Sequence, residues 1–133
     1  MSTGRFLEDL QGRITVTNNA TAPQPLTTYP FTIPDAAGAV DYDIVVDNKF
    51  EVVDVTVGKI GAGAGNTVQI KNTATAISDA IAAAVDKAVT RAGTIDRTTN
   101  NNVVPAGGTL RCTATRSAGS MACEVIVWGY VRA

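Results

Sequence analysis

The chain has 133 residues, of which 45% are hydrophobic and 17% charged, and its 11 basic side chains nearly balance 12 acidic ones. This length fits one domain that folds without disulfides or metal, and the small net charge excludes the basic footprint of a nucleic-acid-binding protein. The absence of histidine excludes Ser–His and Cys–His nucleophile systems and histidine-based metal sites.

The first 34 residues are predicted to form a partly extended N-terminal arm. Residues 1–12 have the pattern of a short helical turn, and residues 13–17 alternate as a first strand. Four of the five prolines lie between residues 18 and 34. Because proline lacks an amide donor and fixes φ, that stretch is predicted to be an extended arm or a sheet edge, with a brief strand at 29–33.

The middle of the chain alternates between apolar and polar residues, as strands do. Residues 40–47 are predicted to be a strand with Tyr42, Ile44 and Val46 on one face. Residues 49–60 are predicted to pair with that strand and to place Val53, Val55 and Val57 on one face. After a glycine loop at 61–65, residues 66–71 form the next predicted strand, with Val68 and Ile70 aligned.

One segment, residues 77–91, has apolar residues at helical spacing. We expect a short helix there, capped by Ser78 or Thr75 and stopped by Gly93. Three further strands are predicted at 94–97, 109–115 and 122–131. About eight strands with frequent turn signals predict that residues 35–133 form a mainly β domain, an antiparallel β-sandwich with one helix.

The last two strands are predicted to form a hairpin that turns between Ser117 and Ala118. This register places Cys112 opposite Cys123. Two reduced thiols in the core are favoured over a disulfide, and a zinc site lacks its other ligands.

The charges are unevenly distributed along the chain. Residues 35–54 contain six acids and one lysine, whereas residues 87–132 contain six bases and two acids. Pairing of these charges across the sheet is the favoured interpretation, and a bipolar docking surface is the alternative. Asp41, Asp43 and Asp47 share a strand face, where a solvated polar surface is favoured over a Ca²⁺ site or an acid/base couple.

Several short motifs resemble those of small head proteins of tailed bacteriophages, the capsid decoration or cement proteins. The motifs are Asn66–Asn72, Arg91–Asp96, Ala106–Arg111 and the final valine-rich strand. The likeness covers roughly residues 50–133. It implies a jelly-roll fold, no catalytic residues and no cofactor. It also implies a homodimer or homotrimer on the outer surface of the virion capsid, where it would straddle neighbouring subunits of the major capsid protein.

The leading hypothesis is therefore a non-enzymatic capsid cement protein that is made in the host cytoplasm, with no membrane or direct nucleic-acid partner. No signal peptide or membrane-spanning run is visible in the sequence. The alternative is a carbohydrate-binding or fibre-type adhesion module that uses Trp128, Tyr130 and the acidic strand. A role of both rings as core or interface anchors is favoured over a sugar platform, and Ile126 on the same face favours burial. Capsid or inter-subunit contacts are assigned to Phe6, Leu7, Leu10, Pro23, Pro25, Tyr29, Pro30 and Phe31.

Overall fold

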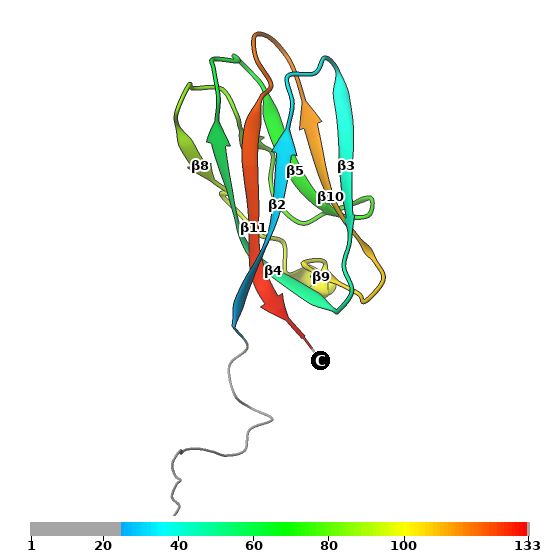
Figure 1. Ribbon diagram of the computed structural model, residues 1–133. Helices are drawn as coiled ribbons and strands as arrows, with labels where there is room; N and C mark the ends of the chain where they lie inside the picture. The colour runs from blue at the N-terminus through cyan, green and yellow to red at the C-terminus, as the bar shows by residue number, and fades with distance from the viewer. Residues whose placement is uncertain (1–24, 133) are drawn as a thin grey trace, which may run out of the picture.

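The computed structural model describes residues 25–132 as two antiparallel sheets packed face to face (Figure 1). The first, the β11 sheet, contains in order β2 (Leu26–Ile33), β11 (Cys123–Val131), β4 (Phe50–Lys59) and β8 (Val89–Arg91), with β9 (Val103–Val104) also beside β4. The second, the β10 sheet, contains β3 (Ala39–Val45), β10 (Thr109–Thr115), β5 (Thr67–Asn72) and β6 (Thr75–Ala76), with β7 (Ile81–Ala82) also beside β5. The predicted antiparallel β-sandwich is confirmed.

The strand pairs are nested along the chain. β2 pairs with β11, β3 with β10, β4 with β8, and β5 with β6 and β7. Successive pairs alternate between the two sheets, so the chain resembles one long antiparallel ribbon folded over on itself. The long strands of one layer lie over those of the other in Figure 1.

The core lies between the sheets and is built from alternate residues of the long strands. In β5, Val68 and Ile70 are fully buried, as the alternation predicts. The other strands contribute in the same way, and the buried apolar side chains of β4, β10 and β11 are Phe50, Val52, Val55, Val57, Leu110, Cys112, Ala114, Cys123, Val125 and Val127.

The predicted C-terminal hairpin is wrong, although β10 and β11 themselves are confirmed. The two strands belong to opposite sheets: Cys112 pairs with Tyr42 and Ile70, whereas Cys123 pairs with Ile33 and Lys59. The segment between them crosses from one sheet to the other. Local alternation shows where a strand lies but carries no information about which sheet receives it.

Buried Asn66 holds that crossing in place. Its Oδ1 accepts hydrogen bonds from the amides of Ser117 (2.6 Å) and Ala118 (3.1 Å), and its Nδ2 donates to the Ser120 carbonyl (2.7 Å). The side chain therefore replaces the turn hydrogen bonds that a hairpin would have made.

β4 differs from its prediction in its pairing partners and in which of its residues face the core. It pairs with β11, β8 and β9, not with the preceding strand. Its register with β11 shifts between Trp128 and Gly129, whose partners are Asp54 and Val52. Val53 is thus the extra residue of a bulge, and Val52 instead of Val53 faces the core.

The predicted helix at 77–91 is wrong. The segment forms β7 and β8 with turns between them, and the amides of Ile77 and Ser78 both donate to the Ile70 carbonyl. The segment pairs with β5 through its backbone, and Ile77 and Ile81 are buried in the core, a tertiary arrangement that outweighs the helix propensity of the alanines. At residues 94–97 the structure has a single bridge, between Ser78 and Ile95, in place of the predicted strand.

β2 lies at an edge of the β11 sheet, as its prolines predict. It is longer than the expected strand at 29–33, and it buries Phe31 and Ile33 in the core. The sandwich therefore includes residues that were assigned to the N-terminal arm. The helical turn at 1–12 and the strand at 13–17 lie outside the described residues.

Candidate interaction surface

The outer face of the β10 sheet presents paired charges and hydroxyl groups. Arg111 lies directly opposite Asp43, with Nε 2.8 Å from Oδ1 and Nη2 3.1 Å from Oδ2. Thr113 donates to Asp41 at 2.7 Å, and Nη1 of Arg111 is 3.7 Å from the same carboxylate. The hydrogen bonds from Arg111 hold the pKa of Asp43 below its usual value. These carboxylates are thus engaged by their own sheet.

Ion pairs across the strands account for the uneven charge distribution along the chain. Besides Asp43 with Arg111, Arg91 pairs with Asp54 and Arg132 pairs with Glu51. The predicted matching of the acidic stretch with the later bases is confirmed. Exposed pairs of this kind contribute only about 0.2–1 kcal/mol each, so they add little to the stability of the sandwich. Within residues 25–132, no cluster of three or more acidic, cysteine or histidine side chains is placed to hold a metal ion.

The outer face of the β11 sheet is different, because apolar and aromatic side chains project from it. We call this surface the Trp128 face and define it by Leu26, Pro30, Ile126, Trp128 and Tyr130, which neighbour one another across β2 and β11. Leu26 is 51% exposed, Pro30 is exposed, and the others are partly exposed. Both rings lie on the outer face of the sheet, so the expectation that they are core anchors is wrong, whereas the expectation of interface anchors stays a prediction. Glu124 and Trp128 lie on the same face of β11, because their positions in the strand differ by an even number. The charge of Glu124 was therefore the sequence signal that this face points outward.

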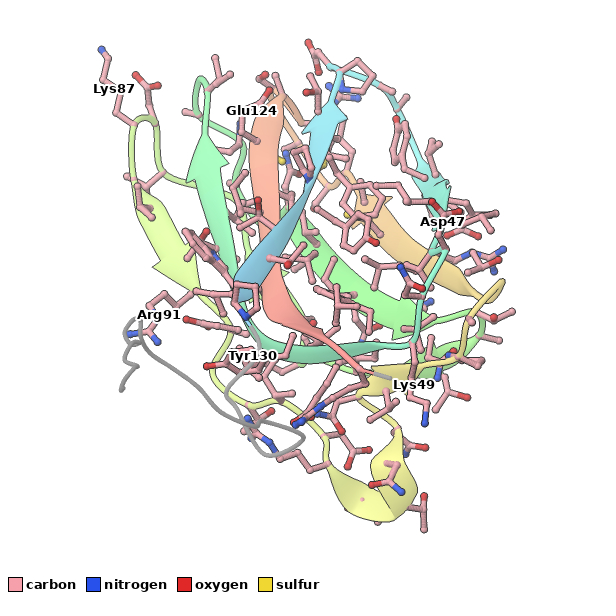
Figure 2. The ribbon with its side chains drawn as sticks, turned by 60° about the horizontal axis from the view of Figure 1, so that its bottom comes forward. Asp47, Lys49, Lys87, Arg91, Glu124 and Tyr130 are labelled. Carbon is pink, nitrogen blue, oxygen red and sulfur yellow. The ribbon has the colours of Figure 1, made fainter. Side chains whose placement is uncertain are left out.

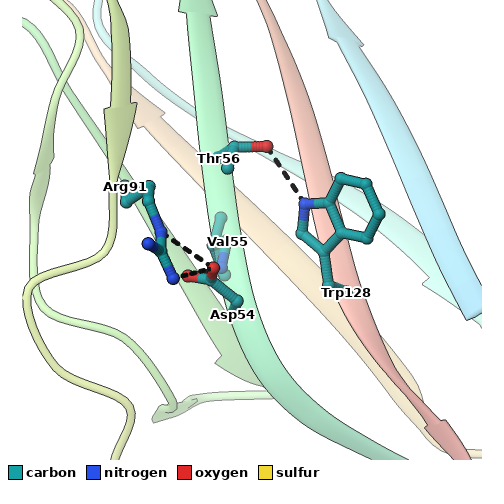
Figure 3. A network of polar contacts seen from close by, with 5 residues as sticks. All are labelled: Asp54, Val55, Thr56, Arg91 and Trp128. Carbon is teal, nitrogen blue, oxygen red and sulfur yellow. Dashed lines mark hydrogen bonds and ion pairs between the residues drawn. The ribbon is translucent and has the colours of Figure 1, made fainter. Parts of the chain in front are cut away.

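Trp128 lies at the centre of this face in a defined orientation. Its Nε1 donates to Oγ1 of Thr56 on β4 at 3.1 Å. Figure 3 shows the face of the indole ring turned toward the viewer, with the ring bonded to Thr56 of β4. The ion pair of Arg91 with Asp54 lies on the other side of β4. On the β2 side, the neighbour of Trp128 in register is Thr28, which is exposed. The ring is held at its polar edge and partly exposed.

Tyr130 is less available than Trp128. The guanidinium carbon of Arg132 lies 5.9 Å from the centre of the Tyr130 ring, and the same guanidinium binds Glu51. Figure 2 shows Tyr130 and Lys49 toward one end of the sandwich, and Glu124 and Lys87 toward the other. Tyr130 therefore packs with a side chain of its own chain.

A second apolar surface lies where β4 ends and β8 begins. We call it the β4–β8 ridge and define it by Ile60, Val85 and Val89, which are 55%, 68% and 73% exposed. Backbone hydrogen bonds from Lys59 to Ala88 and from Lys87 to Lys59 fix the two segments side by side. Exposed apolar groups on a soluble domain mark candidate contact surfaces.

The structure divides the predicted contact residues of β2. Pro25 and Pro30 are exposed, whereas Phe31 is 5% exposed and has almost no surface to offer a partner. Tyr29 packs edge-on against Phe50, with ring centres 4.8 Å apart. Both aromatic residues thus serve the interior of the sandwich. Phe6, Leu7, Leu10 and Pro23 lie outside the described residues.

Both cysteines are buried and free, as the favoured interpretation states. Burial raises the pKa of Cys112, and nearby Cys123 adds to the effect. Burial also raises the pKa of Cys123 to about 11, against the opposing effect of Lys59. Thiols in this state are protonated near neutral pH and are poor nucleophiles.

Lys59 is a buried cation that the sequence analysis did not identify. It is 4% exposed, and its Nζ donates to the carbonyls of Ile60 (2.8 Å) and Ala122 (3.1 Å). It ties the end of β4 to the start of β11. Its role is therefore structural.

A search against protein-family models found no match, and a search of curated proteins found no similar sequence. In the part of the chain that the structure describes, no helix is long and apolar enough to cross a membrane.

Proposed function

We propose that the chain is a non-enzymatic structural protein of a phage virion. It binds the outer surface of the capsid as a symmetric homodimer or homotrimer and cements neighbouring subunits of the major capsid protein. A protein that binds only the assembled shell stabilises it by mass action.

The nested strand pairing is the observation that supports this proposal most directly. In a jelly roll, one antiparallel ribbon is wrapped so that its strands alternate between two sheets, giving eight strands in two Greek keys. The pairs β2 with β11, β3 with β10, β4 with β8 and β5 with β7 fit that connectivity. It is also the fold that the resemblance to cement proteins implies.

The buried polar groups support a scaffold role. Among residues 25–132, four polar side chains are buried, and each of them bonds to backbone groups and so fixes a loop or the end of a strand. They are Lys59, Asn66, Ser78 and Asn102. Buried polar side chains satisfied in this way stabilise one arrangement of the loops. This use of polar groups suits a protein whose task is attachment.

We assign capsid attachment to two separate surfaces. One is the N-terminal segment with Phe6, Leu7, Leu10, Pro23 and Pro25, proposed from the sequence. The other is the β4–β8 ridge, whose exposed valines are well suited to contact with an apolar partner. Two contact regions on one chain would allow it to bridge neighbouring subunits.

The test uses purified shells of the phage whose genome encodes the chain. The full-length protein should sediment with expanded shells at a fixed stoichiometry and raise their rupture temperature. Deleting residues 1–24, which keeps β2 intact, should abolish binding without changing the melting temperature of the sandwich. The proposal is wrong if the full-length protein does not bind these shells.

The ridge is tested by Val89→Asp together with Val85→Asp, because both side chains are largely exposed and the fold should tolerate the changes. We expect at least a tenfold loss of shell affinity. The matched control is Val45→Asp, since Val45 is 64% exposed on the outer face of the β10 sheet. Equal losses in both variants would contradict the assignment to the ridge.

A further inference from the structure

We propose that the Trp128 face binds carbohydrate, with the indole of Trp128 as the stacking platform for a gluco-configured pyranose such as glucose or N-acetylglucosamine. Capsid attachment is assigned to the N-terminal segment and to the β4–β8 ridge, and Val89 of that ridge lies on the same outer face as Arg91, two residues away on β8. The inference names a ligand class for the part of this face around Trp128, and it is tested by sugar binding in the absence of shells.

The orientation of Trp128 is the first argument. Because its N–H is already bonded to Thr56, the ring has no polar group left to satisfy, and the bond holds it along the sheet. A gluco-configured pyranose carries axial C–H groups on both faces, so it presents an apolar surface that matches a flat aromatic ring. A fixed ring also loses little side-chain entropy on binding.

The groups around the ring are the second argument. The hydroxyl of Thr56 accepts the indole hydrogen bond and keeps its own proton to donate. Thr28, the cross-strand neighbour of Trp128, offers an exposed hydroxyl on the other side. Arg91 uses Nε and Nη2 for Asp54, so its Nη1 is not engaged in that pair. A few polar groups around an apolar platform are what fixes a sugar in place.

Charge and size favour a neutral sugar over the other occupants. Asp54 is held by Arg91 and by the amide of Val55, so its charge is already paired within the sheet. The Trp128 face, with five defining side chains on two strands, is small beside the roughly 20–30 residues per side of a stable protein interface. One stacked sugar ring needs no more than this surface offers.

The structure also changes which residues belong to such a site. The acidic strand that carries Asp41 and Asp43 is in the β10 sheet, so it cannot act together with Trp128. Tyr130 packs with Arg132 and is not a second platform. The site therefore consists of Trp128 with Thr28, Thr56 and Arg91.

The test exploits the single tryptophan, which makes intrinsic fluorescence report on this site alone. The full chain is titrated with cellohexaose and with chitohexaose, and the indole N–H resonance is followed by NMR. We expect a saturable change with at least one of them, with a dissociation constant on the order of 1 mM. The inference is overturned if neither oligosaccharide produces a saturable change in the folded protein.

Thr28→Arg is the diagnostic variant. The new guanidinium would cover the neighbouring indole, as Arg132 packs with Tyr130, and should reduce sugar affinity at least tenfold. Thr28→Ser keeps the hydroxyl and should bind normally, and Thr113→Arg is the matched control on the opposite sheet. Unchanged affinity in Thr28→Arg would place binding elsewhere and overturn the inference.

Shell binding separates this inference from the proposed function. Sugar binding by a protein that does not attach to shells would support the glycan site and remove the decoration role. If Thr28→Arg abolished shell binding and no sugar bound, the Trp128 face would be a protein contact, and the glycan inference would be overturned.

Discussion

The two outer faces of the sandwich use similar strands in opposite ways. On the β10 sheet, Arg111 bonds to Asp43 and Thr113 donates to Asp41, so the face is closed by its own side chains. On the β11 sheet the ion pair of Arg91 with Asp54 lies beside Trp128, which stays partly exposed next to Leu26 and Pro30. A face that satisfies its own polar groups gains nothing specific from a partner, whereas exposed aromatic and aliphatic groups are stabilised when covered.

This difference depends on alternation in two strands that follow each other in the sequence. β10 places threonines and Arg111 outward, and β11 places Ile126, Trp128 and Tyr130 outward. Both strands bury small apolar residues on the inner side. The inner residues of both strands thus form one core, while the outer residues differ and give the two faces different chemistry.

The largest expected effect comes from breaking the crossing that sends β10 and β11 to opposite sheets. Asn66→Ala removes hydrogen bonds to the amides of Ser117 and Ala118 and to the carbonyl of Ser120. Because Asn66 is 1% exposed, these groups lose partners that water cannot fully replace. We expect a loss of about 2–4 kcal/mol in the free energy of unfolding, measured by urea denaturation.

Asn72→Ala is the control for this variant, since Asn72 also donates to backbone carbonyls, those of Asn101 and Val103, but is more exposed. It should cost about 1 kcal/mol or less. If the two asparagine variants were equally stable, Asn66 would not be what holds the crossing.

The next effect concerns the bulge that shapes the Trp128 face. A Cβ at Gly129 would lie 2.6 Å from Cζ of Phe50 and would also clash with the Glu51 carbonyl. Gly129→Ala should therefore cost about 1–3 kcal/mol by overpacking and should shift the NMR signals of Trp128 and Tyr130.

Gly58→Ala is the matched control on the same sheet, because its Cβ would meet only the Glu124 carbonyl, at 3.9 Å. It should be close to neutral by denaturant unfolding. A Gly129→Ala protein as stable as the Gly58→Ala protein would show that the bulge tolerates a side chain.

The sequence predicted the strands better than their partners. β10 and β5 follow directly from alternating valine, isoleucine, leucine and threonine, since one face of each is buried. The pairing of β10 with β3 and β5, and not with β11, depends on Asn66, a residue that is distant in sequence from the crossing it holds.

The failed helix has a similar physical origin. Ile77 and Ile81 are four residues apart, which fits one face of a helix, but it also fits two short extended pieces that both face the core. Asp79, which a helix would use near its first turn, instead accepts hydrogen bonds from the amides of Gly93 and Thr94. The partial exposure of Trp128 could have been predicted from the charge of Glu124 on the same face of β11. Its hydrogen bond to Thr56 could not, because that contact depends on the register between β4 and β11.

The smallest expected effect tests whether the β10 face is closed by its own charges. Hydrogen bonds from Arg111 lower the pKa of Asp43, so the pair contributes stability above the pKa of an unfolded aspartate, about 3.9, and loses it as the pH falls through the lower folded value. Arg111→Ala should therefore melt slightly below the wild type at pH 7, and the difference should shrink towards pH 2. Arg116→Ala is the control, because Arg116 bonds to the Gly119 carbonyl and not to a carboxylate. A difference between wild type and Arg111→Ala that did not change with pH would mean that Arg111 acts through packing alone, and the contrast between the two faces would then rest on shape and not on charge.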